Sequence, residues 1–120
     1  QQGLSGKADT NLGNLSTAGK DLASGFGMPS NRYIDLTLGA SGSTYTAPAN
    51  GWYHLKKQAN GNGQVLSLQT PKMQIDGNAT VNGNYVGLIL PVVKGDVLTV
   101  YYNLGGNTAV FRFIYAEGAE

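Results

Sequence analysis

The fold is decided by YVGLILPVV at residues 85–93, VLTVYY at 97–102 and VFRFIY at 110–115, three segments typical of β-strands. Successive side chains of a strand point to opposite faces, so a strand with one solvent-exposed face alternates apolar and polar residues. The first and third segments are apolar on both faces, and such strands are covered on both sides. In a chain of 120 residues one cover is the domain's own core. We expect the other to be another copy of the chain.

The region from Asn31 onward has the same β-strand character, with short strands. The turn signals NG at 50–51 and NGNG at 60–63 separate them, because Asn and Gly tolerate the positive φ angles of tight hairpin turns. Eight or nine short strands, with a turn signal roughly every ten residues, predict a β-sandwich or barrel. The other expected strands are residues 33–38, 44–46, 52–57, 64–69, 72–76 and 79–81.

Residues 1–30 differ in composition, and we interpret them as a stalk that precedes a β domain at residues 31–120. The segment is rich in glycine, and its apolar residues recur at steps of three or four, which indicates a short helix at about residues 17–24. A helix of that length is marginal alone, so we expect three copies to pack their Leu15, Ala18 and Leu22 faces together. The alternative is a flexible linker.

The bulk composition disfavours several classes of function. Charged residues make up 12% of the chain, about half the usual share, and the net charge is +1. Without a basic patch, nucleic-acid binding by phosphate neutralisation has little support. The absence of cysteine removes disulfides and thiolate chemistry. No apolar run approaches the ~20 residues that span a bilayer, and we expect no membrane insertion and see no signal peptide.

Three segments of the β region resemble the trimeric jelly roll of the tumour-necrosis-factor-like family, which also forms the globular head of the first complement component. YTAPANGWY at 45–53 matches the aromatic-x-x-Pro-x-x-Gly-x-Tyr motif at the start of that fold. Residues 88–101, with Gly95-Asp96 between two strands, resemble its penultimate segment. Residues 111–115 resemble its aromatic closing strand. The resemblance covers about residues 32–116 and implies an all-β jelly-roll sandwich assembled as a homotrimer.

A second resemblance concerns the N-terminal segment. GKADTNLGNLSTAGK at residues 6–20 is similar to connectors upstream of tip domains in bacteriophage tail fibres, and residues 39–55 and 111–120 also look like fibre tips. The two resemblances together imply a receptor-binding tip on a stalk, exposed on the virion. The implied partners are further copies of the chain and a host-cell surface glycan or protein. The resemblance does not name the receptor.

The family also implies which surface forms the trimer. Its inner sheet holds the last strand and the strand before the Gly-Asp turn, and that sheet faces the threefold axis. Arg112 interrupts the last strand, and Asp35, Glu117 or a neighbouring C-terminus could pair with it; otherwise it lies at the rim. The residues that we expect in the interface are Leu15, Leu22, Leu88, Leu90, Phe111, Phe113 and Tyr115.

Candidate catalytic and metal-binding residues are few. His54 is the only histidine, and a catalytic base needs a positioned partner while a metal site needs several ligands. We interpret it as a sheet-surface or interface histidine that could tune assembly. No pair of carboxylates is indicated for glycoside hydrolysis, and no ligand run for calcium. We therefore expect a protein that is not an enzyme and binds no cofactor or metal.

Recognition is expected in the loops, because loops on a rigid scaffold usually carry it. We place the loops at residues 47–51, 69–72, 82–84 and 103–107 at the tip, and those at 60–63 and 94–96 toward the stalk. Two other functions stay open: a structural cap that trimerises and registers a fibre, and a bacterial surface or spore-coat head. The candidate receptor-binding residues are Tyr45, Asn50, Lys72, Asn82, Asn84, Tyr102, Asn103 and Asn107.

Overall fold

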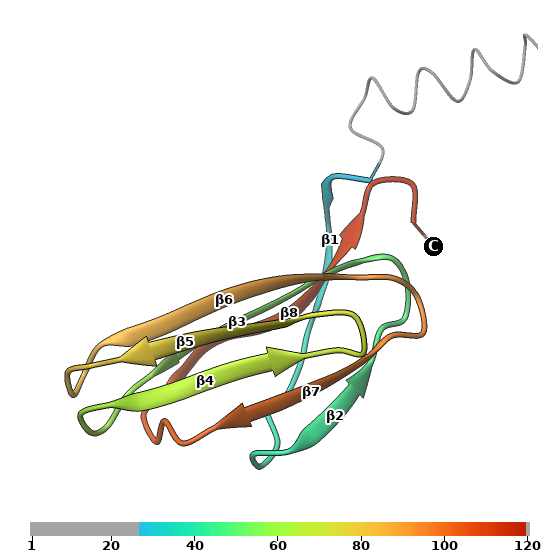
Figure 1. Cartoon of the computed structure of the whole chain (residues 1–120). Helices are drawn as coiled ribbons and strands as arrows, with labels where there is room; N and C mark the ends of the chain where they lie inside the picture. Colours follow the sequence, from blue (N-terminus) through green and yellow to red (C-terminus); the bar gives the residue numbers. More distant parts are fainter. Residues whose placement is uncertain (1–26, 120) are drawn as a thin grey trace, which may run out of the picture.

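The computed structural model describes residues 27–119, and these form two four-stranded antiparallel sheets (Figure 1). The first sheet has the order β1-β8-β3-β6 and the second the order β2-β7-β4-β5. The predicted all-β class is therefore confirmed. Within the described part of the chain, no helix is long and apolar enough to cross a membrane. The strands are β1 (Pro29–Asp35), β2 (Ser43–Thr46), β3 (Gly51–Gln58), β4 (Gln64–Gln69), β5 (Gln74–Ala79), β6 (Tyr85–Val92), β7 (Val97–Tyr102) and β8 (Thr108–Ala116).

Two strand predictions need correction. The expected strands at 72–76 and 79–81 are one strand, β5, which runs through Gly77-Asn78 without a turn. Gly77 serves packing there, since a Cβ atom on it would collide with Cγ1 of Val86. The first strand begins at Pro29 and ends at Asp35, earlier than the predicted 33–38, because residues 29–35 pair with β8. The β domain therefore begins before residue 31.

The core lies between the two sheets, and every strand except β1 contributes the alternate side chains of one face. The first sheet supplies Tyr53 and Leu55 from β3, Leu90 from β6 and Phe113 from β8. Tyr53 and Phe113 are register partners, and their rings meet edge to face at 5.2 Å between centroids, a favoured aromatic geometry. The second sheet covers them with Leu66, Leu68, Leu98 and Val100.

Four of the predicted trimer-interface residues lie in this core. Leu88 and Leu90 are 9% and 1% exposed, and Phe111 and Phe113 are 4% and 0% exposed. They face the second sheet, because they share a sheet face with Tyr53 and Leu55, so they cannot line an interface between copies. The half-buried Tyr115 packs edge to face on Phe113. Leu15 and Leu22 lie outside the described residues.

The first sheet nevertheless has a second apolar face, as predicted for β6 and β8. The side chains that alternate with the core point away from it, and most are apolar. Tyr85 and Ile89 of β6 are 47% and 49% exposed, and Tyr33 of β1 is 49% exposed. We call this surface the apolar outer face, and it consists of Tyr33, Trp52, Tyr85, Ile89, Pro91, Val110 and Ile114.

The outer face of the second sheet is polar by comparison. Its alternate positions carry mostly hydroxyl and amide side chains, with Asp76 as its one charge among the described strands. Val65, Val97 and Tyr101 are the larger apolar side chains on it. The two sheets therefore differ in what they present to the outside, and the difference follows directly from the residues that alternate with the core.

Gly51 gives a direct test of how β3 and β8 meet. A Cβ atom on Gly51 would collide with the backbone oxygen of Ile114 and lie 2.7 Å from Cζ of Phe113. On Gly87 it would meet only Cγ and Cβ of Lys56, at 3.8 and 3.9 Å. We expect Gly51→Ala to destabilise the fold by ~1–3 kcal/mol or more, and the matched Gly87→Ala to be neutral or slightly stabilising. Chemical denaturation measures both, and equal effects would contradict this packing.

Candidate recognition loops and assembly face

The loops gather at two opposite ends of the domain, because successive strands run in opposite directions between these ends (Figure 1). We call the end that holds residues 27–28 and 117–119 the terminal end, and loops 47–50, 70–73 and 93–96 lie there. The opposite, far end holds the other four loops, at residues 36–42, 59–63, 80–84 and 103–107.

This arrangement separates the predicted receptor-binding residues. Asn82, Asn84, Asn103 and Asn107 lie at the far end, as predicted, and loop 93–96 lies toward the chain ends, also as predicted. Asn50 and Lys72 lie at the terminal end, and loop 59–63 lies at the far end, so these three placements were wrong. The short strand β2 returns the chain to the terminal end before loop 47–50. Because β5 is one strand rather than two, the loops that follow it also alternate between the two ends differently from the prediction.

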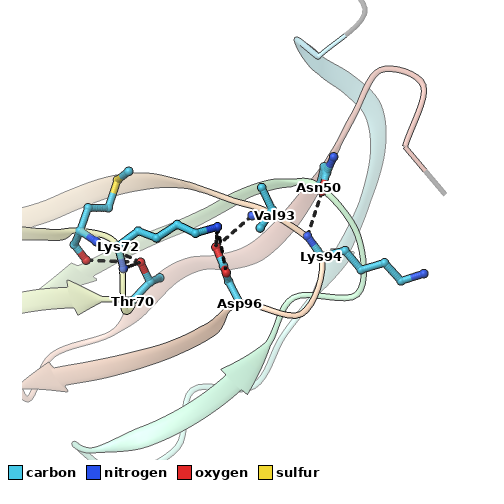
Figure 2. A network of polar contacts seen from close by, with 7 residues as sticks. Asn50, Thr70, Lys72, Val93, Lys94 and Asp96 are labelled. Carbon is cyan, nitrogen blue, oxygen red and sulfur yellow. Dashed lines mark hydrogen bonds and ion pairs between the residues drawn. The ribbon is translucent and has the colours of Figure 1, made fainter.

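The terminal-end side chains brace the loops on which they lie (Figure 2). Nζ of Lys72 lies 3.3 Å from Oδ1 of Asp96, and Oδ2 of Asp96 accepts the backbone N–H of Val93 at 3.1 Å. Oδ1 of Asn50 accepts the backbone N–H of Lys94 at 2.9 Å. These contacts tie loops 47–50, 70–73 and 93–96 together. They give Asn50 and Lys72 a structural role.

Asparagine side chains also connect the far-end loops to one another. Oδ1 of Asn62 accepts the backbone N–H of Asn82 at 2.8 Å, and Oδ1 of Asn60 accepts that of Gly105 at 3.1 Å. Oδ1 of Asn103 accepts a backbone N–H of β4 at 2.8 Å. Asn60 and Asn62 were missed as members of this end, although the NGNG sequence marked their turn. These bonds hold three loops in one arrangement.

Three asparagine side chains at the far end do not connect loops in this way. The side chains of Asn82, Asn84 and Asn107 are exposed, and none hydrogen-bonds to another residue between 27 and 119. An amide side chain has two N–H donors and an acceptor oxygen, so it can hydrogen-bond to sugar hydroxyls or to peptide groups. These three residues are therefore the best-placed candidates for contact with a receptor.

A buried lysine lies under loop 103–107. Lys57 is only 8% exposed, and its Nζ donates to the backbone oxygen of Gly106 at 2.8 Å and to Oγ1 of Thr108 at 3.1 Å. The ammonium group also lies 5.3 Å from the ring centroid of Tyr102. No salt bridge joins Lys57 to a carboxylate in the described chain. The carbonyl, hydroxyl and ring compensate its charge and hold the loop to β3.

Tyr45 and Tyr102 act within the fold. The hydroxyl of Tyr45 accepts the N–H of Gly39 at 2.7 Å, and the hydroxyl of Tyr102 donates to the oxygen of Gly39 at the same distance. Both side chains are half-buried, and the Tyr45 ring packs edge to face on Phe111. Their polar groups therefore hold loop 36–42, which leaves little of them for a receptor.

Basic groups cross the middle of the apolar outer face. Nε of Arg112 lies 3.2 Å from Oδ1 of Asp35, one of the partners predicted for it, although the angle is poor for a hydrogen bond. The guanidinium also lies over the Tyr33 ring at 4.0 Å. Lys56 lies over the Tyr85 ring at 5.3 Å. Stacked in this way, the cations lie against aromatic rings of the face.

The described residues form no assembled metal-binding cluster. No group of three or more His, Asp and Glu residues between 27 and 119 lies close enough to hold a metal ion. Partial burial, then the charges of Arg112 and Lys56, lower the pKa of His54. Its pairing partners across the sheet are Arg112 on β8 and Ile89 on β6, so no carboxylate orients it. Hydrogen bonds from Ser67 and Gln74 lower the pKa of Asp76 on the other sheet.

His54 should make folding stability depend on pH. Its pKa in the folded chain lies below the ordinary 6.5, so the unfolded chain binds the proton more readily. The contribution of neutral His54 to the free energy of unfolding should be fully present above this ordinary value, and it should be lost as the pH falls toward the folded pKa. We expect the unfolding midpoint to decrease more for the natural chain than for His54→Gln between about pH 8 and about pH 5. Parallel curves would contradict this assignment.

Comparison with known proteins gives no relative from which a function could be transferred. No protein-family model matches the chain, and no curated protein matches its sequence. The residues and their geometry therefore carry what can be inferred about the function of this chain.

Proposed function

We propose that this chain is the receptor-binding tip of a phage tail fibre, exposed on the virion, and that it acts as a homotrimer without catalysing a reaction. The carrying observation is that one sheet has an apolar outer face while the exposed amide side chains of Asn82, Asn84 and Asn107 lie at the far end, opposite the terminal end. The first feature favours self-assembly, and the second favours recognition of a host-surface polysaccharide or protein away from the attachment point.

The sheet topology supports the jelly-roll part of this proposal. The orders β1-β8-β3-β6 and β2-β7-β4-β5 place first and last strands side by side and send successive strands to alternate sheets, except for β4 and β5. A jelly roll is an eight-stranded double sheet of this kind. The resemblance of residues 45–53 and 111–115 to the tumour-necrosis-factor-like fold agrees with this topology.

The apolar outer face supports the trimer. Exposed apolar side chains that gather on one sheet face are typical of an interface, whereas single exposed apolar residues are ordinary. Complete burial of a side chain such as Ile89 contributes ~1.5–3 kcal/mol. Ile89, Tyr85 and Tyr33 are all about half exposed in the single chain. A second copy is a fitting occupant, because the cations on this face are already stacked on rings or paired with Asp35.

The far end supports the recognition part. Its loops are held by asparagine side chains and by Lys57, so Asn82, Asn84 and Asn107 are presented from a fixed backbone. Ordering in advance lowers the entropic cost of binding. Three copies would present three such sets, and multivalency converts weak contacts into firm attachment.

A structural cap is the second candidate, and the network at the terminal end favours it. Lys72, Asp96 and Asn50 join three loops beside the chain ends (Figure 2), which suits a domain that transmits register to a preceding segment. Under this function the chain would trimerise, but the far-end amides would be dispensable.

The trimer is tested with two matched charge substitutions. Ile89 is 49% exposed on the apolar outer face, and Val97 is 41% exposed on the outer face of the second sheet. We expect the natural chain to have three times the 12.6 kDa mass of one chain by light scattering. Ile89→Asp should yield folded monomers, because it would bury a carboxylate in the interface. Val97→Asp should remain trimeric. A monomeric natural chain would remove this part of the proposal.

Recognition is tested at the free amides. We expect the combined Asn82→Ala, Asn84→Ala and Asn107→Ala variant to remain folded and trimeric and to lose most of its adsorption to host cells. Each substitution removes a donor–acceptor group that no described residue uses. Asn31→Ala is the control, because Asn31 is an exposed residue of β1 near the terminal end. Undiminished adsorption of the triple variant would favour the structural cap instead.

A further inference from the structure

The outer face of the second sheet carries a row of neighbouring side chains that runs across the strands (Figure 1). Tyr101 of β7 lies opposite Ser67 of β4, and Ser67 lies opposite Asp76 of β5. Register partners in an antiparallel sheet have Cβ atoms ~4.5–5.5 Å apart, so these three side chains lie next to one another. The row therefore joins an aromatic ring, a hydroxyl and a carboxylate on one open surface.

Tyr101 is the aromatic residue of this row, and it is exposed although β7 is an inner strand of the sheet. The residue is 47% exposed, whereas its neighbour Val100 in β7 is completely buried. A Cβ atom on Gly42 would lie 3.8 Å from Cε1 of Tyr101, so the absence of a side chain at Gly42 leaves that part of the ring uncovered. The exposed ring presents an apolar face that ends in a polar hydroxyl.

Two glutamine side chains next to the row are already oriented by hydrogen bonds. Nε2 of Gln69 donates to Oγ of Ser67 at 3.2 Å, and Nε2 of Gln74 donates to the two carboxylate oxygens of Asp76 at 3.0 and 3.1 Å. Gln69 and Gln74 are register partners on β4 and β5. Their amide oxygens accept no hydrogen bond from another residue between 27 and 119, so these acceptors are available to a ligand.

We propose that this surface, which we call the Tyr101 platform, binds a neutral polysaccharide. The Tyr101 ring would stack on the apolar face of a sugar ring, and the amide, hydroxyl and carboxylate groups would hydrogen-bond to sugar hydroxyls, which both donate and accept. This inference goes beyond the proposed function, because the platform is separate from the far-end amides and needs no trimer. The platform consists of Ser67, Gln69, Gln74, Asp76 and Tyr101.

The charge of the second sheet favours a neutral glycan over an acidic one. Its four strands contain no lysine or arginine, and Asp76 is their one charged residue. An acidic polysaccharide would bring its own carboxylates toward a carboxylate that no cation of the sheet neutralises, and like charges repel. A neutral chain of sugars avoids this repulsion and still uses Asp76 as an acceptor.

The apolar content of the platform disfavours a protein as its ligand. Protein interfaces depend on clusters of buried aromatic and arginine anchors. This face has Tyr101 as its one aromatic side chain, together with Val65 and Val97 on other rows. Because the platform lies on the sheet opposite to the apolar outer face, it stays accessible both in a single chain and in the proposed trimer.

The proposal is tested by measuring the binding of the full chain to immobilised dextran, mannan and galactan by biolayer interferometry. We expect the natural chain to bind at least one of these neutral polysaccharides. Tyr101→Ala should weaken this binding roughly tenfold, because it removes the stacking ring. Tyr101→Phe keeps the ring and should retain most of the affinity. Alginate is the acidic probe, and any binding to it should not depend on Tyr101.

Gln74→Ala tests the polar part of the platform without changing the ring. Gln74 is exposed on β5, the last strand of the sheet, so the variant should fold as the natural chain does, and it should bind roughly threefold more weakly. The control is the triple variant Asn82→Ala, Asn84→Ala and Asn107→Ala, which leaves the platform intact and should bind these polysaccharides normally.

Three results would overturn the proposal. The first is that none of the three neutral polysaccharides binds the natural chain. The second is that folded Tyr101→Ala and Gln74→Ala bind as well as the natural chain does, or that Tyr101 is needed equally for alginate. The third is that the triple asparagine variant alone loses binding, which would assign the glycan to the far end. That last result would support the proposed function while removing the Tyr101 platform, so the two failures are distinguishable.

Discussion

The alternation of side chains between the two faces of each strand is the constraint on which the rest of this structure depends. Strands β3, β6 and β8 of the first sheet each have one face in the core, which is filled by residues such as Tyr53, Leu90 and Phe113. The side chains that alternate with them must lie outside. Because β6 and β8 are apolar at both sets of positions, the chain retains an apolar surface that it cannot bury alone. We propose that self-association buries this remaining apolar surface.

Close packing at the sheet junctions makes this constraint strict. Gly51 lets β3 approach β8 so closely that no Cβ atom fits, and Gly77 has the same function where β5 passes β6. Interiors packed at this density permit few alternative registers. A shift of one residue would exchange Leu90 for Ile89 in the core and would expose the complete inner face.

Polar side chains hold the loops in place at both ends of the domain. At the terminal end, side chains such as Asp96 and Asn50 satisfy backbone groups of neighbouring loops. At the far end, Asn60, Asn62 and Lys57 hydrogen-bond to backbone groups of neighbouring loops in the same way. Other asparagine side chains there make no such bond within the described residues. A low-charge surface supported in this way suits neutral partners, because recognition then depends on hydrogen-bond geometry more than on long-range attraction.

The sequence by itself determined the all-β class, most strand positions and the doubly apolar character of β6 and β8, and it gave Asp35 as one of several possible partners of Arg112. Strand periodicity and turn residues are local, so they can be read along the chain. It did not determine which apolar face is inside, and Leu88, Leu90, Phe111 and Phe113 were therefore assigned to the wrong surface. Nor did it place Asn50, Lys72 and Asn60 at their ends of the domain. Only the tertiary structure decided these points, because the inside of a strand and the end of a loop depend on which distant strands pair and how often the chain reverses.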